Sequence, residues 1–165
     1  MTGVLAGQRI LSARENDNSA RTLAYTAIVA NSASSASTTE VVAITTPTIL
    51  FRSARAFRLS IKGRMALTAT GDEGQIGVRK TNSTTNPKLF DSFRFGGGPA
   101  GTYGYFFQNI VINTSGSDVS VPLVMTYFRV TGTSVAISAS TADPSYLMVE
   151  DIGPASDYPS ATSLT

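Results

Sequence analysis

The chain of 165 residues contains no histidine, no cysteine and no tryptophan. Because histidine is the side chain that titrates nearest neutral pH, the commonest acid–base group is missing. Without cysteine the chain has no disulfide and no thiolate, which is the softest nucleophile and metal ligand. A serine nucleophile would depend on lysine as its base, and only Lys62, Lys80 and Lys88 are present. We therefore expect no enzymatic activity, no metal site and no cofactor.

Charge is also sparse. Charged residues make up 15% of the chain, against about a quarter in an average domain. Thirteen basic and eleven acidic residues leave a net charge of +2, which is too small for a nucleic-acid-binding surface. No segment approaches the ~18 apolar residues of a membrane helix, and residues 1–7 lack the basic start of a signal peptide. We expect neither nucleic acid nor a membrane as a partner.

What the chain has in abundance is serine and threonine, 41 residues together, and short segments of alternating polarity. The clearest segment places Phe57, Leu59 and Ile61 on one face of a strand, and polar residues between them on the other. It predicts a long strand with a bulge or bend at Gly63. Eight to ten such segments, with turns about every 8–12 residues, predict an all-β antiparallel β-sandwich. A jelly-roll-like topology is preferred over an immunoglobulin-like one.

We expect three parts along the chain: an N-terminal arm (1–20), the β-sandwich domain (21–153) and a C-terminal tail (154–165). The arm contains one short apolar and basic segment, and the tail shows no periodicity. Both ends are expected to extend from the sandwich and to contact a neighbour.

A basic cluster occupies the first long strand segment and holds five of the thirteen positive charges: Arg52, Arg55, Arg58, Lys62 and Arg64. Arginine forks pair well with carboxylates, so the cluster is predicted to be a docking patch for an acidic neighbour. The alternative interpretation is the solvated face of one strand.

The segment 103–113 is apolar on both faces, with Phe106 on one face and Tyr105 and Phe107 on the other. Two-sided hydrophobicity indicates an outer face that a neighbour covers. We assign the subunit interface to Tyr103, Tyr105 and Phe107.

Carboxylates are few. The adjacent pair Glu150 and Asp151 is expected to accept main-chain or arginine hydrogen bonds at a strand end. Asp72 lies in a turn, and a calcium site that joins it to Asp91 or Asp118 is a weaker alternative.

Three stretches, 51–63 (FRSARAFRLSIKG), 77–81 (GVRKT) and 146–154 (YLMVEDIGP), occur in this order. Together they resemble a family of small virion proteins from tailed phages of actinobacteria. The resemblance spans roughly residues 22 to 155 and leaves out the N-terminal arm. It implies a jelly-roll-like virion component on the capsid surface or on the tail, assembled in the host cytoplasm.

The resulting hypothesis is a capsid decoration or cement protein that binds the major capsid protein and stabilises the shell through self-association. A closed ring, a homotrimer, is the expected assembly. The expected shell anchor lies in the arm and consists of Val4, Leu5, Arg9, Ile10, Leu11 and Arg14. The alternative is a tail or fibre module that binds host-surface carbohydrate through Tyr103, Tyr105 and Asp91.

Overall fold

The computed structural model describes residues 19–81, 88–92 and 94–164. Its regular elements are β1 (Arg21–Ile28), β2 (Val41–Thr45), β3 (Ile49–Phe51), β4 (Arg55–Leu67), β5 (Glu73–Lys80), β6 (Lys88–Asp91), β7 (Phe95–Gly96), β8 (Gly101–Asn113), β9 (Val119–Val121), β10 (Leu123–Thr131), β11 (Val135–Ser138), β12 (Ser145–Pro154), the short 3-10 helix η1 (Ala155–Asp157) and β13 (Thr162–Ser163). Within those ranges no helix is long and apolar enough to cross a membrane.

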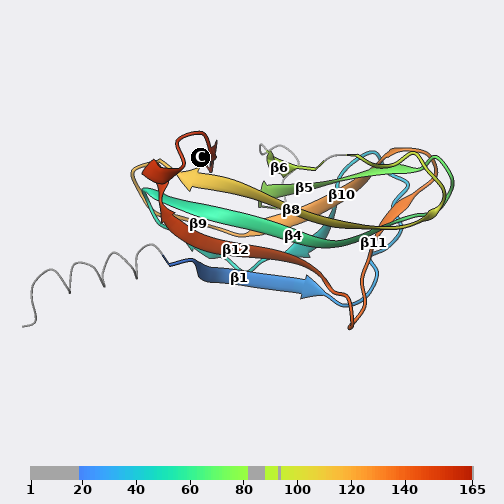
Figure 1. The fold of residues 1–165 in the computed structure, drawn as a ribbon, viewed down its shortest axis with the longest axis horizontal. Coiled ribbons are helices and arrows are strands. Elements are labelled where there is room, and N and C mark those ends of the chain that lie inside the picture. The colour runs from blue at the N-terminus through green and yellow to red at the C-terminus, as the bar shows by residue number, and fades with distance from the viewer. Residues whose placement is uncertain (1–18, 82–87, 93, 165) are drawn as a thin grey trace, which may run out of the picture.

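The strands form two main sheets. The β4 sheet has the order β1-β12-β4-β8-β13, with β11 also paired to β4. The β5 sheet has the order β2-β10-β5-β6, with β7 also paired to β5. Figure 1 shows β8, β4, β12 and β1 side by side as one layer. A separate short pair, β3 and β9, completes the strands.

The connections follow the jelly-roll pattern. Of the eight principal strands, β1, β4, β8 and β12 lie in one sheet and β2, β5, β6 and β10 in the other. The chain therefore changes sheet at every step between them except from β5 to β6. This is the double-sheet, eight-strand arrangement of a jelly roll. The predicted all-β antiparallel sandwich with jelly-roll topology is confirmed.

The core lies between the two sheets. Phe57, Leu59 and Ile61 of β4 are buried there, as their alternation predicts, and the ring of Phe57 meets the edge of Phe51 at 4.9 Å. Burial of each such large side chain contributes about 1.5–3 kcal/mol to the stability of the fold. The intervening β4 residues consequently face outward, which defines the outer face of the β4 sheet.

Gly63 is not a bulge. β4 pairs with β8 along its whole length with no shift of register, and Gly63 lies opposite Tyr105. A Cβ atom at Gly63 would lie 2.1 Å from Oγ of Ser145 and 2.6 Å from the Tyr105 hydroxyl. Glycine stands here because a side chain has no room, so the bulge prediction is wrong.

The C-terminal residues do not extend from the sandwich, in contrast to the expected tail. β13 pairs in parallel with β8, and the Leu164 N–H donates to the carbonyl of Ile112 at 2.9 Å. The Leu164 side chain is fully buried in the main core, and Ala155 packs with Ala56 and Ile112 in a second apolar cluster. These contacts are too few and too scattered in sequence to produce a periodic signal.

Candidate interaction surface

The outer face of the β4 sheet carries a row of apolar side chains, which we call the outer strip: Tyr25, Ala27, Phe106, Tyr146 and Met148. Strand register brings them together. Tyr25 of β1 pairs with Met148 of β12, and Ala27 pairs with Tyr146. Tyr146 pairs in turn with Lys62 of β4, which pairs with Phe106 of β8. The strip thus extends over β1 and β12, and Lys62 of β4 separates these residues from Phe106 on β8.

Two large side chains of the outer strip are open to water, and Tyr146 and Met148 are half-buried. Tyr25 is 54% exposed and Phe106 is 56% exposed, and they are two of the four large hydrophobic side chains exposed in the described ranges. The rings of Tyr25 and Tyr146 lie 5.1 Å apart. A sheet face that gathers several apolar side chains with exposed surface marks an interaction site more often than an isolated exposed residue does.

Two arginines of the predicted docking patch are paired within the chain. The Arg55 guanidinium lies 2.7 Å from Asp151, and Arg58 lies 2.9 Å from Glu150. The hydrogen bond with Glu150 raises the pKa of Arg58. Asp151 also accepts the N–H of Gly153 at 3.1 Å. The predicted role of the two adjacent carboxylates as hydrogen-bond acceptors is confirmed.

The other members of the patch are more open. Arg64 is 2.9 Å from Asp143, but its side chain is 54% exposed. Arg52 and Lys62 are exposed as well. Lys62 and Arg64 stand on the outer face of β4 beside the outer strip, so positive charge adjoins the apolar surface. Docking of an acidic neighbour at this patch stays a prediction.

The residues assigned to the subunit interface, Tyr103, Tyr105 and Phe107, lie on the core side of β8. These residues pair with Met65, Gly63 and Ile61 of β4, whose side of the sheet faces the core. Tyr105 is only 6% exposed, and its burial raises the pKa of its phenol. Phe107 meets the rings of Phe90 and Phe95 at 5.8 and 5.7 Å. The outward residue of this aromatic run is Phe106.

The residues of the carbohydrate alternative do not form an exposed platform. The Tyr103 hydroxyl donates to the carbonyl of Pro99 at 2.6 Å, and Tyr105 is buried. Asp91 accepts from Lys88 at 3.1 Å.

Sequence reasoning missed a charged network around Glu40, on the outer face of the β5 sheet. Glu40 pairs with Arg79 at 2.6 Å and with Lys88 at 3.0 Å, and it accepts the hydroxyl proton of Thr126. Burial alone would raise the pKa of Glu40, but the hydrogen bonds from Arg79, Lys88 and Thr126 lower it to about 2. No local pattern signals this network because its members lie on four separate segments.

Asp72 is a structural carboxylate. It is fully buried and accepts the main-chain N–H groups of Thr68, Ala69 and Thr133. The bond from Thr133 does most to lower the pKa of Asp72, against the opposing effect of burial, and the pKa falls to about 2. Asp72 thereby joins the β4–β5 turn to the β10–β11 turn. Among the described residues no group of three carboxylates could hold a metal ion.

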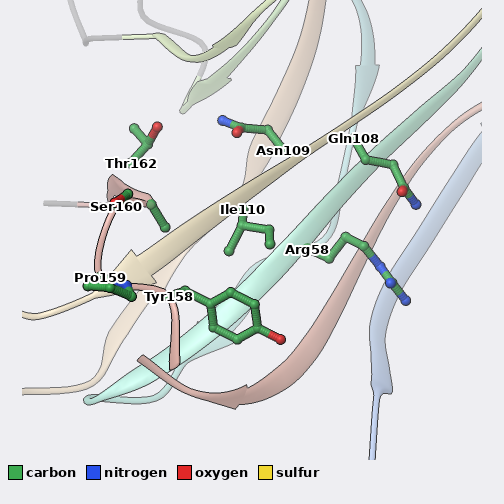
Figure 2. A pocket seen from close by; sticks show the side chains of 9 residues that line it. Arg58, Gln108, Asn109, Ile110, Tyr158, Pro159, Ser160 and Thr162 are labelled. Carbon is green, nitrogen blue, oxygen red and sulfur yellow. The ribbon is translucent and has the colours of Figure 1, made fainter. Parts of the chain in front are cut away.

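A groove of about 560 Å³ lies between the second half of β8 and the segment that leads into β13. One side consists of Gln108, Asn109 and Ile110 of β8, with Arg58 of β4 beside them, and the other consists of residues 158–162. Figure 2 shows the Tyr158 ring and the Ile110 side chain at this groove. It adjoins the outer strip because Gln108 follows Phe106 by one outward position on β8.

The predicted shell anchors Val4, Leu5, Arg9, Ile10, Leu11 and Arg14 lie outside the described residues.

No protein-family model and no curated protein matches the chain. Among solved structures, the chain is similar to the infectious bursal disease virus VP2 subviral particle, with 10% identity and a TM-score of 0.48 over 84% of this chain and 38% of the other. Structures of the Gx and Gt strains of the same virus give 10% and 9% identity, with TM-scores of 0.46 and 0.45 over 83% of this chain. This chain spans less than two fifths of the length of those proteins.

Proposed function

We propose that this protein is a structural component of a virion, a capsid decoration protein whose outer strip binds the major capsid protein of the shell. The observation that carries the proposal is the exposure of Tyr25 and Phe106 on a sheet face that also presents Tyr146 and Met148. Covering such a surface with a neighbour contributes roughly 25 cal/mol per Å² of apolar area removed from water.

The strip is suited to repeated attachment because it lies on regular strands. Its side chains project from β1, β12 and β8, which the ladders with β4 and with each other hold in register. A partner that binds a preformed sheet face loses little conformational entropy in ordering it. The architecture supports the proposal by analogy, since jelly rolls serve in viral capsid and lectin domains.

Positive charge beside the strip indicates the chemistry of the partner surface. Lys62 lies between Tyr146 and Phe106 in the register, and Arg64 follows on the same face of β4. Within the described residues Lys62 has no ion-pair partner, so its charge is open to a neighbour. We infer that the shell surface presents carboxylates around an apolar centre. Pairing of these charges would fix the orientation of the bound protein more than it would add to the affinity.

The first test is the amount of this protein in particles purified from the virus that encodes it. Quantitative mass spectrometry should find hundreds of copies per particle, whereas a tail component would be present in a few to a few dozen. Absence of the chain from purified particles would overturn the proposal.

The second test is direct binding of variants to shells that lack this protein. Tyr25→Ser should weaken co-sedimentation about tenfold, which corresponds to about 1.4 kcal/mol. Leu50→Ser is the matched control, because Leu50 is 48% exposed but lies on β3 and is not a member of the strip. Equal binding by the Tyr25 variant and the wild type would remove the outer strip from the shell contact.

A further inference from the structure

β8 is an edge strand for most of its length. On one side β4 pairs with all of β8, from Gly101 to Asn113. On the other side β13 pairs only with Val111 and Ile112. Within the described part of the chain, no strand pairs with this second edge between Gly101 and Ile110.

The hydrogen-bonding groups on that edge can be assigned. The carbonyl of Asn113 accepts the N–H of Ala54, on the β4 side, whereas the carbonyl of Ile112 accepts the N–H of Leu164, on the opposite side. Successive residues of a strand direct their main-chain groups to alternate sides. The even-numbered residues Gly104, Phe106 and Gln108 therefore direct N–H and C=O away from β4, and all three are exposed.

This edge lacks the features that normally prevent edge pairing. Such features are charged side chains, proline, bulges and short length. Residues 101–113 include no charged residue and no proline. The ladder with β4 runs without a register shift, so the strand is long and regular.

We propose that this edge pairs with β8 of a second copy, antiparallel, about a two-fold axis at Phe106. The two β4 sheets then form one continuous sheet, with Gly104 of each copy opposite Gln108 of the other. Each of these pairs exchanges two main-chain hydrogen bonds. The inference rests on the proposed function, because it names the self-association contact of the decoration protein. It replaces the three-fold ring that the sequence analysis expects.

A second copy fits the edge better than a charged peptide does. The edge offers an incoming strand no charge to pair with, and two identical edges meet without repulsion. The two Lys62 side chains would be three strand spacings apart, roughly 14 Å, which exceeds the Debye length of about 8 Å at physiological salt. The two Phe106 rings would lie side by side at the axis on the outer face, so the outer strips of the two copies would join on one surface.

The pairing brings small residues of the second copy to the end of β8 that residues 158–162 flank. In the two-fold register Ile110 lies opposite Thr102 of the other copy and Gln108 lies opposite Gly104. The incoming segment is therefore small at its outward positions where it approaches residues 158–162, which line the groove. β13 sets the limit of the pairing, because it occupies this edge at Val111 and Ile112.

Charge substitutions test the edge and its register together. A Gly104→Lys/Gln108→Lys variant places lysines opposite lysines, whereas Gly104→Glu/Gln108→Lys places glutamate opposite lysine. Both are accommodated in the single subunit, since Gln108 is exposed and a Cβ at Gly104 meets nothing within 4 Å. By sedimentation velocity we expect wild type at twice 17.3 kDa, at least tenfold weaker association for the lysine pair, and recovery for the glutamate–lysine pair.

Hydrogen exchange gives an independent readout on the wild type. The amides of Phe106 and Gln108 should exchange quickly in dilute protein and slowly in concentrated protein. The amides of Tyr105 and Phe107 should exchange slowly at both concentrations, because they donate to β4 within one subunit. An oligomer of any size whose Phe106 and Gln108 amides stay fast would overturn the edge pairing, as would equal association of the two charge variants. A monomer at every concentration would overturn it too.

The two proposals fail separately. Tyr25→Ser lies on β1, at the far edge of the sheet, and should weaken shell binding without changing self-association. The lysine pair should weaken self-association at least tenfold while binding of the single subunit to shells persists.

Discussion

Replacement of Gly63 by alanine should destabilise the fold sharply, because the interior beneath β4 has no space for a methyl group. The added Cβ would lie 2.1 Å from Oγ of Ser145 and 2.6 Å from the hydroxyl of Tyr105, whereas ordinary contacts begin at 3.4 Å. Neither neighbour moves freely. Ser145 is fully buried and donates to the carbonyl of Ser138, and Tyr105 is packed against Phe95 and Phe107.

Overpacking a core costs about 1–3 kcal/mol, and we expect the upper end of that range because two oxygens must move. For a domain of this size, 3 kcal/mol corresponds to a Tm lower by about 6–12 °C. Urea unfolding followed by tyrosine fluorescence, together with a thermal scan, measures both quantities on one preparation.

Gly104→Ala is the matched control, because it lies on the adjacent strand in open space and should leave stability within about 0.5 kcal/mol or raise it slightly. Combining Gly63→Ala with Tyr105→Phe and Ser145→Gly removes the clashing atoms, so the triple variant should be more stable than the sum of its parts predicts. A Gly63→Ala midpoint equal to that of Gly104→Ala would refute the reasoning.

Three further predictions follow from buried groups. Leu164→Ala should lower the free energy of unfolding by about 2–5 kcal/mol, whereas Leu50→Ala should change it little. Equal urea midpoints for the two variants would mean that the C-terminus is not docked. Asp72→Ala leaves several main-chain donors without an acceptor and should cost more than about 2 kcal/mol, whereas exposed Asp157→Ala should not; equal melting temperatures would contradict the role of Asp72. The pKa values of Glu40 and Asp72 are both lowered to about 2, so the unfolded chain binds more protons and stability should fall as pH decreases from about 4.5 towards 2. Glu40→Gln should have a lower free energy of unfolding at neutral pH, and that free energy should fall less steeply between about pH 4.5 and 2. A variant whose stability falls with pH as steeply as that of the wild type would contradict the role of the Glu40 network.

Local sequence patterns were sufficient to predict the strands and an antiparallel β-sandwich. The alternation through Phe57, Leu59 and Ile61 identifies both the strand and its buried face, because polar residues occupy the other face. Where both faces are apolar, as in β8, alternation identifies the strand but not the buried side. Tyr105 was therefore assigned to the surface and Phe106 was not.

The sequence by itself determined that the chain forms short alternating strands, that these strands stack as an antiparallel jelly roll, and that Glu150 and Asp151 accept hydrogen bonds. The strands follow from patterns that span a few residues, and the jelly-roll topology was the arrangement preferred for that number of strands. Only the tertiary structure decided which face of β8 is buried, that Leu164 returns to the core, and that Glu40 meets Arg79 and Lys88. Those outcomes depend on strand register and on contacts between segments distant in sequence, which no local periodicity encodes.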